Sequence, residues 1–312
     1  MSATLPHLDA EALTRLVPMS AAIEAVEAVL KAGLDPEAEP PRGVVDVPGG
    51  QLLLMPSSTR SYTGVKIATV TPGNAARDLP RVQGLYLLLD GTTHTPLALL
   101  DGIALTSLRT PAVSGVAIKH LAVPETRRLL VFGTGPQAWG HVEAVRAVRP
   151  TLAHVDVVAR DPGRVAAFVD RCRDAGLSAA PATPADVATA DVVCCCTTAR
   201  EPLFDSALLP PHATVAAVGS HEPDAREVDE GLLSRAVVVA ESHEVALREC
   251  GDIILATAAG AFDPGHLRTL AELVRGEVET PDEQPRLFKS AGMAWEDLGV
   301  GAAAYERWTS LG

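Results

Sequence analysis

The stretch Leu129-Leu130-Val131-Phe132-Gly133-Thr134-Gly135-Pro136-Gln137-Ala138 turns an apolar run through Gly-x-Gly into a helical pattern. A dinucleotide pyrophosphate needs this geometry, because one glycine makes the tight turn, a second lets backbone approach phosphate, and the helix N-terminus offers free N–H groups. Ala138 replaces the usual third glycine and is small enough for close helix–strand packing. The loop therefore predicts a dinucleotide site, against the alternative of a purely structural turn. The contacts expected there come from Gly133, Thr134, Gly135, Pro136 and Gln137.

Apolar runs of strand length and helical patterns alternate from Arg127 to about Val239. The runs lie at 127–133, 154–159, 191–196, 214–218 and 236–240, and the helical patterns at 137–148 and 162–175. Such alternation is typical of an α/β fold with a Rossmann-type, doubly wound parallel sheet that carries helices on both faces. The glycine loop follows the first strand of this unit, where that fold binds its dinucleotide.

The residues before this unit show a different pattern. Short runs at 43–47, 51–56, 62–70, 82–90 and 96–100 are separated by Gly, Pro, Asn and Thr, which predicts an antiparallel sheet. Helices are expected at 21–31, capped by Ser20, and at 101–120, where Pro111 should kink or shorten the helix. The tail from 290 to 308 has helical periodicity and is expected to pack on this first domain. The predicted domains are an α+β domain of residues 1–120, completed by 290–312, and a dinucleotide-binding domain of residues 121–289.

Composition bounds the class of protein. The 312 residues suggest about two domains, and the 47% of hydrophobic residues support a sizeable core. A net charge of −13 argues against binding to nucleic acid. No apolar run is long enough for a membrane span and no export signal is visible, so we expect a cytoplasmic protein without a membrane partner.

The five cysteines give no pattern for a metal site. Cys194, Cys195 and Cys196 are adjacent, so their side chains alternate across a strand and cannot all face one ion. We expect buried thiols in a reducing compartment, and no metal.

Three cationic residues precede the predicted nucleotide domain: Arg42, Lys66 and Arg109. Lys66 lies in an apolar strand pattern, where a buried ammonium needs a partner. A guanidinium suits a carboxylate, and a desolvated lysine can act as an acid or a base. From spacing alone, the alternative that these are surface or ion-paired cations stays open.

Five motifs occur in order along the chain. They are Gly64-Val65-Lys66; Asp101-Gly102 with Leu108-Arg109-Thr110; Gly133-Thr134-Gly135-x-Gln137-Ala138; Gly219-Ser220-x-x-Pro223-Asp224-x-Arg226-Glu227-Val228-Asp229; and Phe288-Lys289-Ser290-x-Gly292-Met293-Ala294-x-Glu296-Asp297. Together they resemble the ornithine cyclodeaminase/mu-crystallin family, from about residue 40 to the C-terminus. Five ordered motifs are far more specific than any one of them.

The resemblance implies a homodimer and hydride exchange at the Cα–N bond of a small amino or imino acid. It implies that Arg42, Lys66 and Arg109 hold the substrate carboxylate near the nicotinamide, and that Lys66 assists proton transfer. The implied cofactor contacts are Arg109, Thr110, Val218, Ser220, Lys289, Ser290 and Gly292. Thr197 and Thr198 follow an apolar run and are further candidates, because Rossmann folds meet the cofactor at the carboxyl ends of strands.

The sequence departs from the cyclodeaminase pattern at His221, where that motif places an aspartate that handles the side-chain amine of the substrate. Histidine titrates near neutral pH and can act as a base, but it cannot supply an anionic partner for an ammonium. The alternative is a loop histidine without a role. The residues that follow, Pro223-Asp224-x-Arg226-Glu227, are more like the mu-crystallin branch of the family.

A second departure concerns the cofactor. The end of the second strand of this fold normally carries an acid for the NAD ribose, but here the sequence reads Val158-Ala159-Arg160-Asp161, with Arg164 one turn on. Arg160 resembles the mu-crystallin arginine that meets the NADP phosphate. Asp161 can serve a ribose or cap the next helix. The expected cofactor is NAD or NADP, with NADP favoured.

Three functions follow from the sequence. The first is an NAD(P)-dependent amino or imino acid oxidoreductase with Lys66 and His221 as catalytic candidates. The second is an ornithine cyclodeaminase that forms proline and ammonia and recycles its NAD. The third is a mu-crystallin-like, NADP-dependent protein that binds a small ligand.

Overall fold

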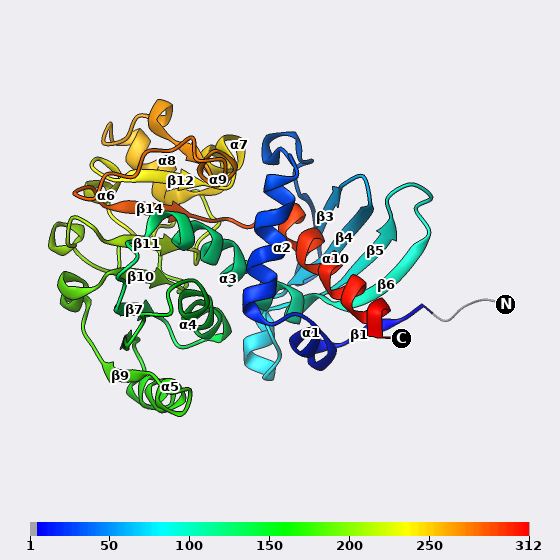
Figure 1. Cartoon of the computed structure of the whole chain (residues 1–312), viewed down its shortest axis with the longest axis horizontal. Helices are drawn as coiled ribbons and strands as arrows, with labels where there is room; N and C mark the ends of the chain where they lie inside the picture. Colours follow the sequence, from blue (N-terminus) through cyan, green and yellow to red (C-terminus); the bar gives the residue numbers. More distant parts are fainter. Residues whose placement is uncertain (1–4, 312) are drawn as a thin grey trace. The chain divides into compact units, whose positions relative to one another are not determined.

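The computed structural model describes residues 5–311, and the chain divides into two compact units (Figure 1). Unit 1 contains the chain up to Thr110 and again from Met293, and unit 2 is Pro111–Gly292. The first division falls inside helix α3 (Gly102–Leu121), before the expected domain boundary at residue 120. Both chain ends therefore belong to one unit, and the middle of the chain forms the other.

Unit 1 is built on a six-stranded sheet in the order β1-β6-β5-β4-β3-β2. Strands β2 to β6 pair antiparallel, as the sequence predicted, and the unpredicted strand β1 pairs parallel with β6. The bounds are β1 His7–Leu8, β2 Gly43–Val47, β3 Gly50–Ser58, β4 Tyr62–Val70, β5 Val82–Asp90 and β6 Pro96–Asp101. Side chains alternate across this sheet, so that Met55, Lys66 and Tyr86 lie side by side on one buried face.

Helices of both chain ends belong to unit 1. They are α1 (Ala10–Leu16), α2 (Met19–Lys31) and α10 (Ala294–Leu311), with short 3-10 helices η1 (Pro36–Ala38) and η2 (Pro72–Arg77). Helix α10 contacts β3, β4 and β5 on one side and α2 on the other, as Figure 1 shows. Its Gly301 lets it come close to the sheet, because a Cβ there would lie 3.3 Å from the Tyr86 ring.

Two local helix predictions were wrong, the cap at Ser20 and the shortening at Pro111. Helix α2 begins at Met19 after Pro18, so Ser20 lies inside the helix and does not cap it. Helix α3 continues through Pro111 to Leu121 instead of ending there. Proline removes one backbone hydrogen bond, but the helix is buried from Arg109 to Ile118, and this packing offsets that loss.

Unit 2 holds an eight-stranded, fully parallel sheet in the order β13-β12-β14-β11-β10-β7-β8-β9. Its strands are β7 Arg128–Phe132, β8 His154–Val158, β9 Ser178–Pro181, β10 Val192–Cys195, β11 Thr214–Ala217, β12 Val237–Ala240, β13 Arg268–Thr269 and β14 Arg286–Lys289. This confirms the predicted doubly wound sheet. The strand order reverses between β7 and β10, which is where such sheets bind a ligand at their carboxyl ends.

The helices of unit 2 connect these strands. They are α4 Pro136–Val148, α5 Pro162–Asp174, α6 Glu230–Leu233, α7 His243–Glu249, α8 Gly251–Ala258 and α9 Leu270–Val274, with the 3-10 helices η3 Pro184–Thr189, η4 Ser206–Leu208 and η5 Pro264–His266. No helix within residues 5–311 is long and apolar enough to cross a bilayer.

The glycine loop joins β7 to α4 in the predicted manner. Gly133 has a φ of +110°, and a Cβ there would lie 2.6 Å from the carbonyl oxygen of Cys196. Gly135 is the N-cap of α4, and no heavy atom would lie within 4 Å of a Cβ placed on it. Ala138 is fully buried, as expected for close helix–strand packing. Gly133 is therefore required by the fold, whereas Gly135 keeps open the space that a phosphate needs.

Replacing Gly133 by alanine should lower the free energy of unfolding by about 2 kcal/mol or more, because a left-handed φ and a clash with the Cys196 carbonyl coincide. Gly135→Ala is the matched control and should cost less than about 1 kcal/mol. Urea unfolding of the two variants checks this. Equal losses would show that Gly133 is not under backbone constraint.

Candidate active site

Lys66 is a buried cation on the face of β4 that α10 covers. Its Nζ lies 2.7 Å from Oδ2 of Asp297 and 3.4 Å from Oγ1 of Thr106. The strand alternation directs Lys66 to the same face as Met55 and Tyr86, so an ammonium stands where an apolar side chain is normal. Asp297 supplies the partner that such a burial needs.

Arg109 on α3 forms the second ion pair of the same cluster. Its guanidinium binds Glu296, and its Nε lies 3.6 Å from Oδ1 of Asp297. Glu296 also accepts a hydrogen bond of 2.9 Å from the backbone N–H of Met293, which fixes the start of α10. Lys66, Arg109, Glu296 and Asp297 form what we call the buried charge cluster.

The cluster balances two cations with two carboxylates. Burial lowers the pKa of Lys66 to about 8, and the Arg109 charge adds to that effect while Asp297 opposes it. A lysine with this pKa changes its protonation state close to neutral pH. The geometry therefore offers a proton-transfer group beside a guanidinium that can receive a carboxylate.

The sequence analysis proposed two cations of this cluster as site residues, but it quoted Glu296 and Asp297 only as part of a motif. Lys66 and Arg109 are ion-paired, which was one of the alternatives that the sequence left open, but they are buried and not on the surface. Glu296 and Asp297 carried a usable signal, since the two adjacent acids lie in a run from Ala294 to Tyr305 that is otherwise apolar or small. Arg42 precedes β2 and is half-buried.

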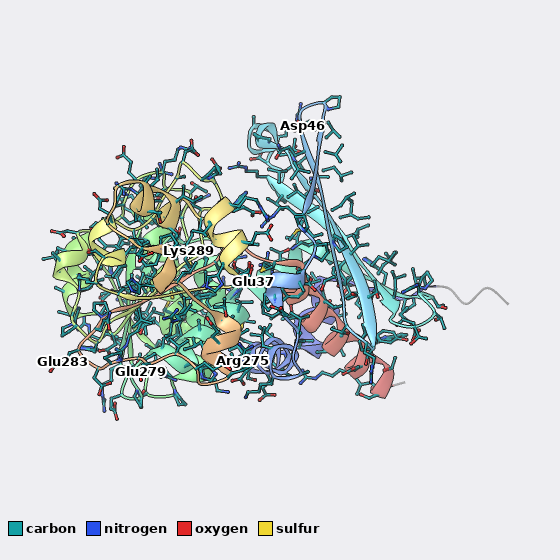
Figure 2. The ribbon with its side chains drawn as sticks, turned by 90° about the horizontal axis from the view of Figure 1, so that it is seen from above. Glu37, Asp46, Arg275, Glu279, Glu283 and Lys289 are labelled. Atoms are coloured by element: carbon teal, nitrogen blue, oxygen red, sulfur yellow. The ribbon has the colours of Figure 1, made fainter. Side chains whose placement is uncertain are left out.

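The predicted cofactor residues of unit 2 gather at the carboxyl ends of its strands. Thr197 and Thr198 follow β10, and Val218 and Ser220 follow β11. Lys289, labelled in Figure 2, ends β14. It precedes Ser290 and Gly292, and Gly292 has a φ of +81°. Thr110 is buried on α3, and His221 is exposed in the loop after Ser220.

Three buried acids, none of them predicted as a site residue, hold these strand ends. Glu227 accepts hydrogen bonds from Thr197 and from Gly219 N, and Asp252 accepts from the backbone N–H groups of Glu227 and Val228. Glu241 accepts from Ser290 Oγ, Ala291 N and Gly292 N. Their partners lie 8 to 51 residues away in sequence, and of the three acids only Glu227 stands in one of the five motifs.

Lys289 completes this arrangement from β14. Its Nζ donates 2.7 Å to the carbonyl oxygen of Ser220 and lies 3.0 Å from Oδ2 of Asp252. Burial lowers the pKa of Lys289, but Asp252 and the other anionic neighbours outweigh it, so the net pKa is raised. The ammonium is thus engaged inside the protein, and a cofactor contact at Lys289 would involve its backbone.

The adenosine end of the predicted cofactor site lies after β8. Arg160, Asp161 and Arg164 are all exposed there. Asp161 caps α5 through Oδ1, which accepts from Gly163 N at 2.8 Å and Arg164 N at 3.1 Å. Capping was one of the two roles that the sequence offered for Asp161, and a contact with ribose stays a prediction.

His141 is a buried histidine of α4 that sequence reasoning missed. Its Nδ1 lies 2.7 Å from the Gln137 carbonyl oxygen and its Nε2 2.9 Å from Ser114 Oγ. Burial lowers its pKa to about 4, so the imidazole is neutral near pH 7, with Nδ1–H donating to Gln137. The ring braces the helix that follows the glycine loop.

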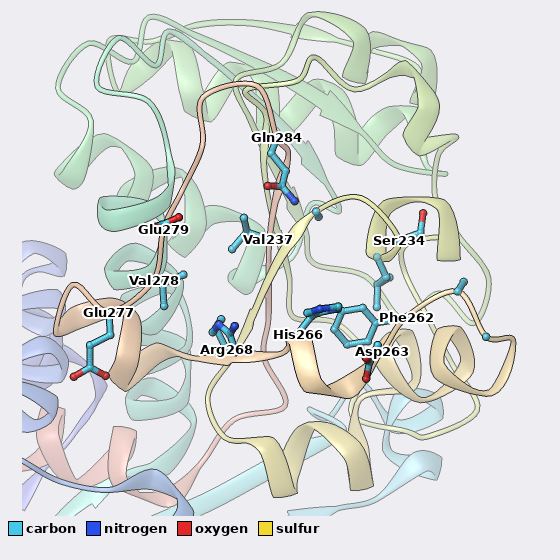
Figure 3. A pocket seen from close by; sticks show the side chains of 14 residues that line it. Ser234, Val237, Phe262, Asp263, His266, Arg268, Glu277, Val278, Glu279 and Gln284 are labelled. Atoms are coloured by element: carbon cyan, nitrogen blue, oxygen red, sulfur yellow. The ribbon is translucent and has the colours of Figure 1, made fainter.

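Unit 2 also has a hollow of about 780 Å³ away from these strand ends. Val237 at the start of β12 and Arg268 at the start of β13 line it, together with Phe262, His266 and Gln284 (Figure 3). It therefore opens at the amino ends of the strands. None of the predicted site residues lines it.

Comparison with known proteins shows the family to which this chain belongs. Residues 7–312 match the model of the ornithine cyclodeaminase/mu-crystallin family. The chain belongs to this family. It is 36% identical over 264 residues to a Delta(1)-pyrroline-2-carboxylate reductase of Bacillus cereus, covering 82% of this chain and 81% of that protein.

Two solved structures share the whole fold. One is the Thermococcus litoralis Delta(1)-pyrroline-2-carboxylate reductase in complex with NADH and L-proline, with a TM-score of 0.92, 31% identity and 98% of both chains covered. The other is an archaeal alanine dehydrogenase dimer with bound NAD, with a TM-score of 0.91, 29% identity, and 98% of this chain and 97% of that chain covered. The resemblance stated from the five motifs is confirmed, and the family assignment covers both units.

Membership of the ornithine cyclodeaminase/mu-crystallin family gives the buried charge cluster a functional context. Asp297→Asn should lower the free energy of unfolding at pH 7 by about 2 kcal/mol or more, because it leaves the Lys66 ammonium buried without its anion. The loss should shrink at pH 9, since Lys66 is then neutral in the wild type and in the variant.

Urea unfolding at the two pH values measures this effect. Glu306→Gln, at an exposed acid of the same helix, is the control and should stay within about 0.5 kcal/mol of the wild type. Adding Lys66→Met to Asp297→Asn should restore most of the loss. A loss that is the same at pH 7 and pH 9 would contradict the ion-pair account.

Proposed function

We propose that this protein is an NAD(P)-dependent reductase of a small cyclic imino acid, of the Δ1-pyrroline-2-carboxylate class, and exchanges hydride at the Cα–N bond. The observation that carries the proposal is the buried charge cluster, in which Lys66 lies 2.7 Å from Asp297 beside the buried Arg109. A second support is the glycine loop, whose Gly135 leaves room for phosphates at a helix N-terminus. Relatives named as reductases and dehydrogenases of such substrates agree with it.

Each cation of unit 1 has a role in this reaction. Arg109 and Arg42 bind the substrate carboxylate, for which a planar guanidinium is well matched. Lys66, as an ammonium, donates a proton to the imine nitrogen, and as a neutral amine it accepts that proton in the reverse direction. A bound nicotinamide cofactor supplies or takes up the hydride. Asp297 holds Lys66 in place at 2.7 Å.

His221 favours this reaction over cyclodeamination of ornithine. It is exposed where the cyclodeaminase motif has an aspartate, and an imidazole does not pair with the side-chain ammonium of a diamino acid. Its imidazole instead suits a small substrate without a second charge, with His221 as an auxiliary base. Ornithine cyclisation and simple ligand binding are the alternatives that the assay below separates.

We infer that the cofactor site accepts NADP as well as NAD. Arg160 and Arg164 are exposed after β8, where a 2′-phosphate would need cations. The relatives with bound cofactor hold NADH or NAD.

The five cysteines form no disulfide and four of them are buried, which supports a reducing, cytoplasmic location.

Enzymatic reduction tests the proposal directly. Purified protein should oxidise NADPH or NADH when given Δ1-pyrroline-2-carboxylate, with a rate that falls as the pH rises through about 8, because Lys66 loses the proton it must donate. Lys66→Ala should lower turnover at least about 100-fold while NAD(P)H still binds. Arg160→Ala should weaken the binding of NADPH and leave the binding of NADH unchanged. Lys119→Ala, at an exposed lysine, is the control.

The outcomes separate the alternatives. Proline and ammonia formed from ornithine and NAD, without an external reductant, would establish cyclodeamination instead. Silence in both assays with ligand-dependent thermal stabilisation would favour the binding protein. Normal turnover by Lys66→Ala would show that the proposed active site is wrong.

We also propose that this protein is a homodimer and that the exposed face of the unit 1 sheet forms the dimer interface. Leu54, Ile67 and Leu85 lie directly opposite one another on β3, β4 and β5 and are 37%, 42% and 48% exposed. A row of this kind on an uncovered sheet face is typical of an interface. The alanine dehydrogenase neighbour is a dimer.

Sedimentation velocity tests the dimer. The wild type should run at twice the mass of the chain, and Ile67→Glu should run as a monomer, because a carboxylate in the apolar row would be buried without a partner. Leu311→Glu, at an apolar residue that is 78% exposed, is the control and should leave the dimer intact. A dimeric Ile67→Glu would place the interface elsewhere.

A further inference from the structure

The loops that would contact the cofactor in unit 2 share one buried anchor, the carboxylate of Glu227. Oε1 accepts hydrogen bonds from Thr197 N at 2.9 Å and from Thr197 Oγ1 at 2.7 Å. Oε2 accepts from Gly219 N at 2.7 Å. One oxygen therefore fixes the loop after β10 and the other fixes the loop after β11, although these loops are more than twenty residues apart along the chain.

The space around Glu227 is tight. A Cβ at Gly219 would lie 2.5 Å from Oε1 of Glu227, so only glycine fits beside the carboxylate. Asp252 holds the backbone of Glu227 by a hydrogen bond of 2.7 Å to its N–H. Both acids are fully buried, and their geometry leaves little freedom to the loop between them.

Lys289, at the end of β14, links a third strand to these two acids. It lies 3.0 Å from Asp252. Burial raises the pKa of Glu227, and the Lys289 ammonium opposes that rise. It donates to the carbonyl oxygen of Ser220, next to Gly219. The ends of β10, β11 and β14 are thus tied together by one lysine and two acids, all on unit 2.

A buried charged network is an expensive way to hold a fold, because apolar residues of the same volume are often at least as stabilising. This network lies at the strand ends, and the groups it restrains belong to loops predicted to contact the cofactor. We propose, on the basis of the proposed function, that Glu227 is a positioning residue that sets the spacing of the Thr197 and Gly219–Ser220 loops for dinucleotide binding. Asp252 and Lys289 support it.

Glu227→Gln isolates this role because glutamine has nearly the same shape. A carboxylate offers an acceptor to each loop, whereas an amide has one oxygen and must turn its NH₂ toward the other loop. Either the N–H of Thr197 or that of Gly219 then loses its acceptor. The two loops can no longer both be held in place.

The test compares direct titrations of NADH and NADPH and steady-state kinetics for the wild type and Glu227→Gln. The dissociation constant and the KM for the cofactor should rise at least about tenfold, the scale of one lost charge-assisted hydrogen bond. The kcat at saturating cofactor should stay within about twofold, because Lys66 is untouched. Glu230→Gln, at an exposed acid paired with Arg226, is the matched control and should keep wild-type affinity.

A purely structural role for Glu227 gives a different result. Glu227→Gln would then melt at a lower temperature, while its folded fraction would bind NADH as tightly as the wild type, and this outcome overturns the proposal. Should Glu227→Gln fail to fold, Asp252→Asn replaces it, because it keeps the acceptor for Glu227 N and removes the charge beside Lys289. Wild-type affinity in folded Asp252→Asn then overturns the proposal.

Failure of the proposed function is distinguishable. If the wild-type protein itself binds neither NADH nor NADPH, both the function and this inference are wrong. If the wild type binds and reduces the imino acid while Glu227→Gln is unchanged, only this inference is wrong.

Discussion

The ion pair between Lys66 and Asp297 is the interaction on which unit 1 depends. It joins two residues 231 positions apart, at a distance of 2.7 Å and almost out of contact with solvent. An ammonium on the covered face of a sheet is tolerated only with an anion beside it, so the C-terminal helix must return to this sheet. The chain accordingly leaves unit 1 at α3 and comes back to it at α10.

That constraint also accounts for the chemistry. Apolar side chains at these two positions would have no proton to transfer. The charged pair keeps a titratable amine in a fixed place, and burial brings its pKa to about 8. Arg109 and Glu296 form the second ion pair, so the buried charge cluster holds equal numbers of cations and carboxylates before a substrate binds. Unit 2 also pairs a buried lysine with an acid, Lys289 with Asp252, but there the anionic neighbours raise the pKa of the lysine.

Sequence patterns predicted what is local and missed what is distant. The glycine loop, the parallel sheet and the bounds of β4 follow from short-range pattern and were predicted correctly. The predicted shortening of helix α3 at Pro111 was wrong, because the burial of residues 109–118 cannot be seen from one proline. Glu227, Asp252 and Glu241 were missed as site residues, since each acts through partners brought near only by the fold.

The ionisation of Lys66 tests the central claim most directly. The chain has four lysines, Lys31, Lys66, Lys119 and Lys289, so ¹³C labelling at the lysine Cε gives few NMR signals to assign. A pH titration, with Lys66→Met to identify the resonance, should show Lys66 losing its proton near pH 8. A Lys66 that titrates at or above the ordinary lysine value of about 10.4 would contradict the account.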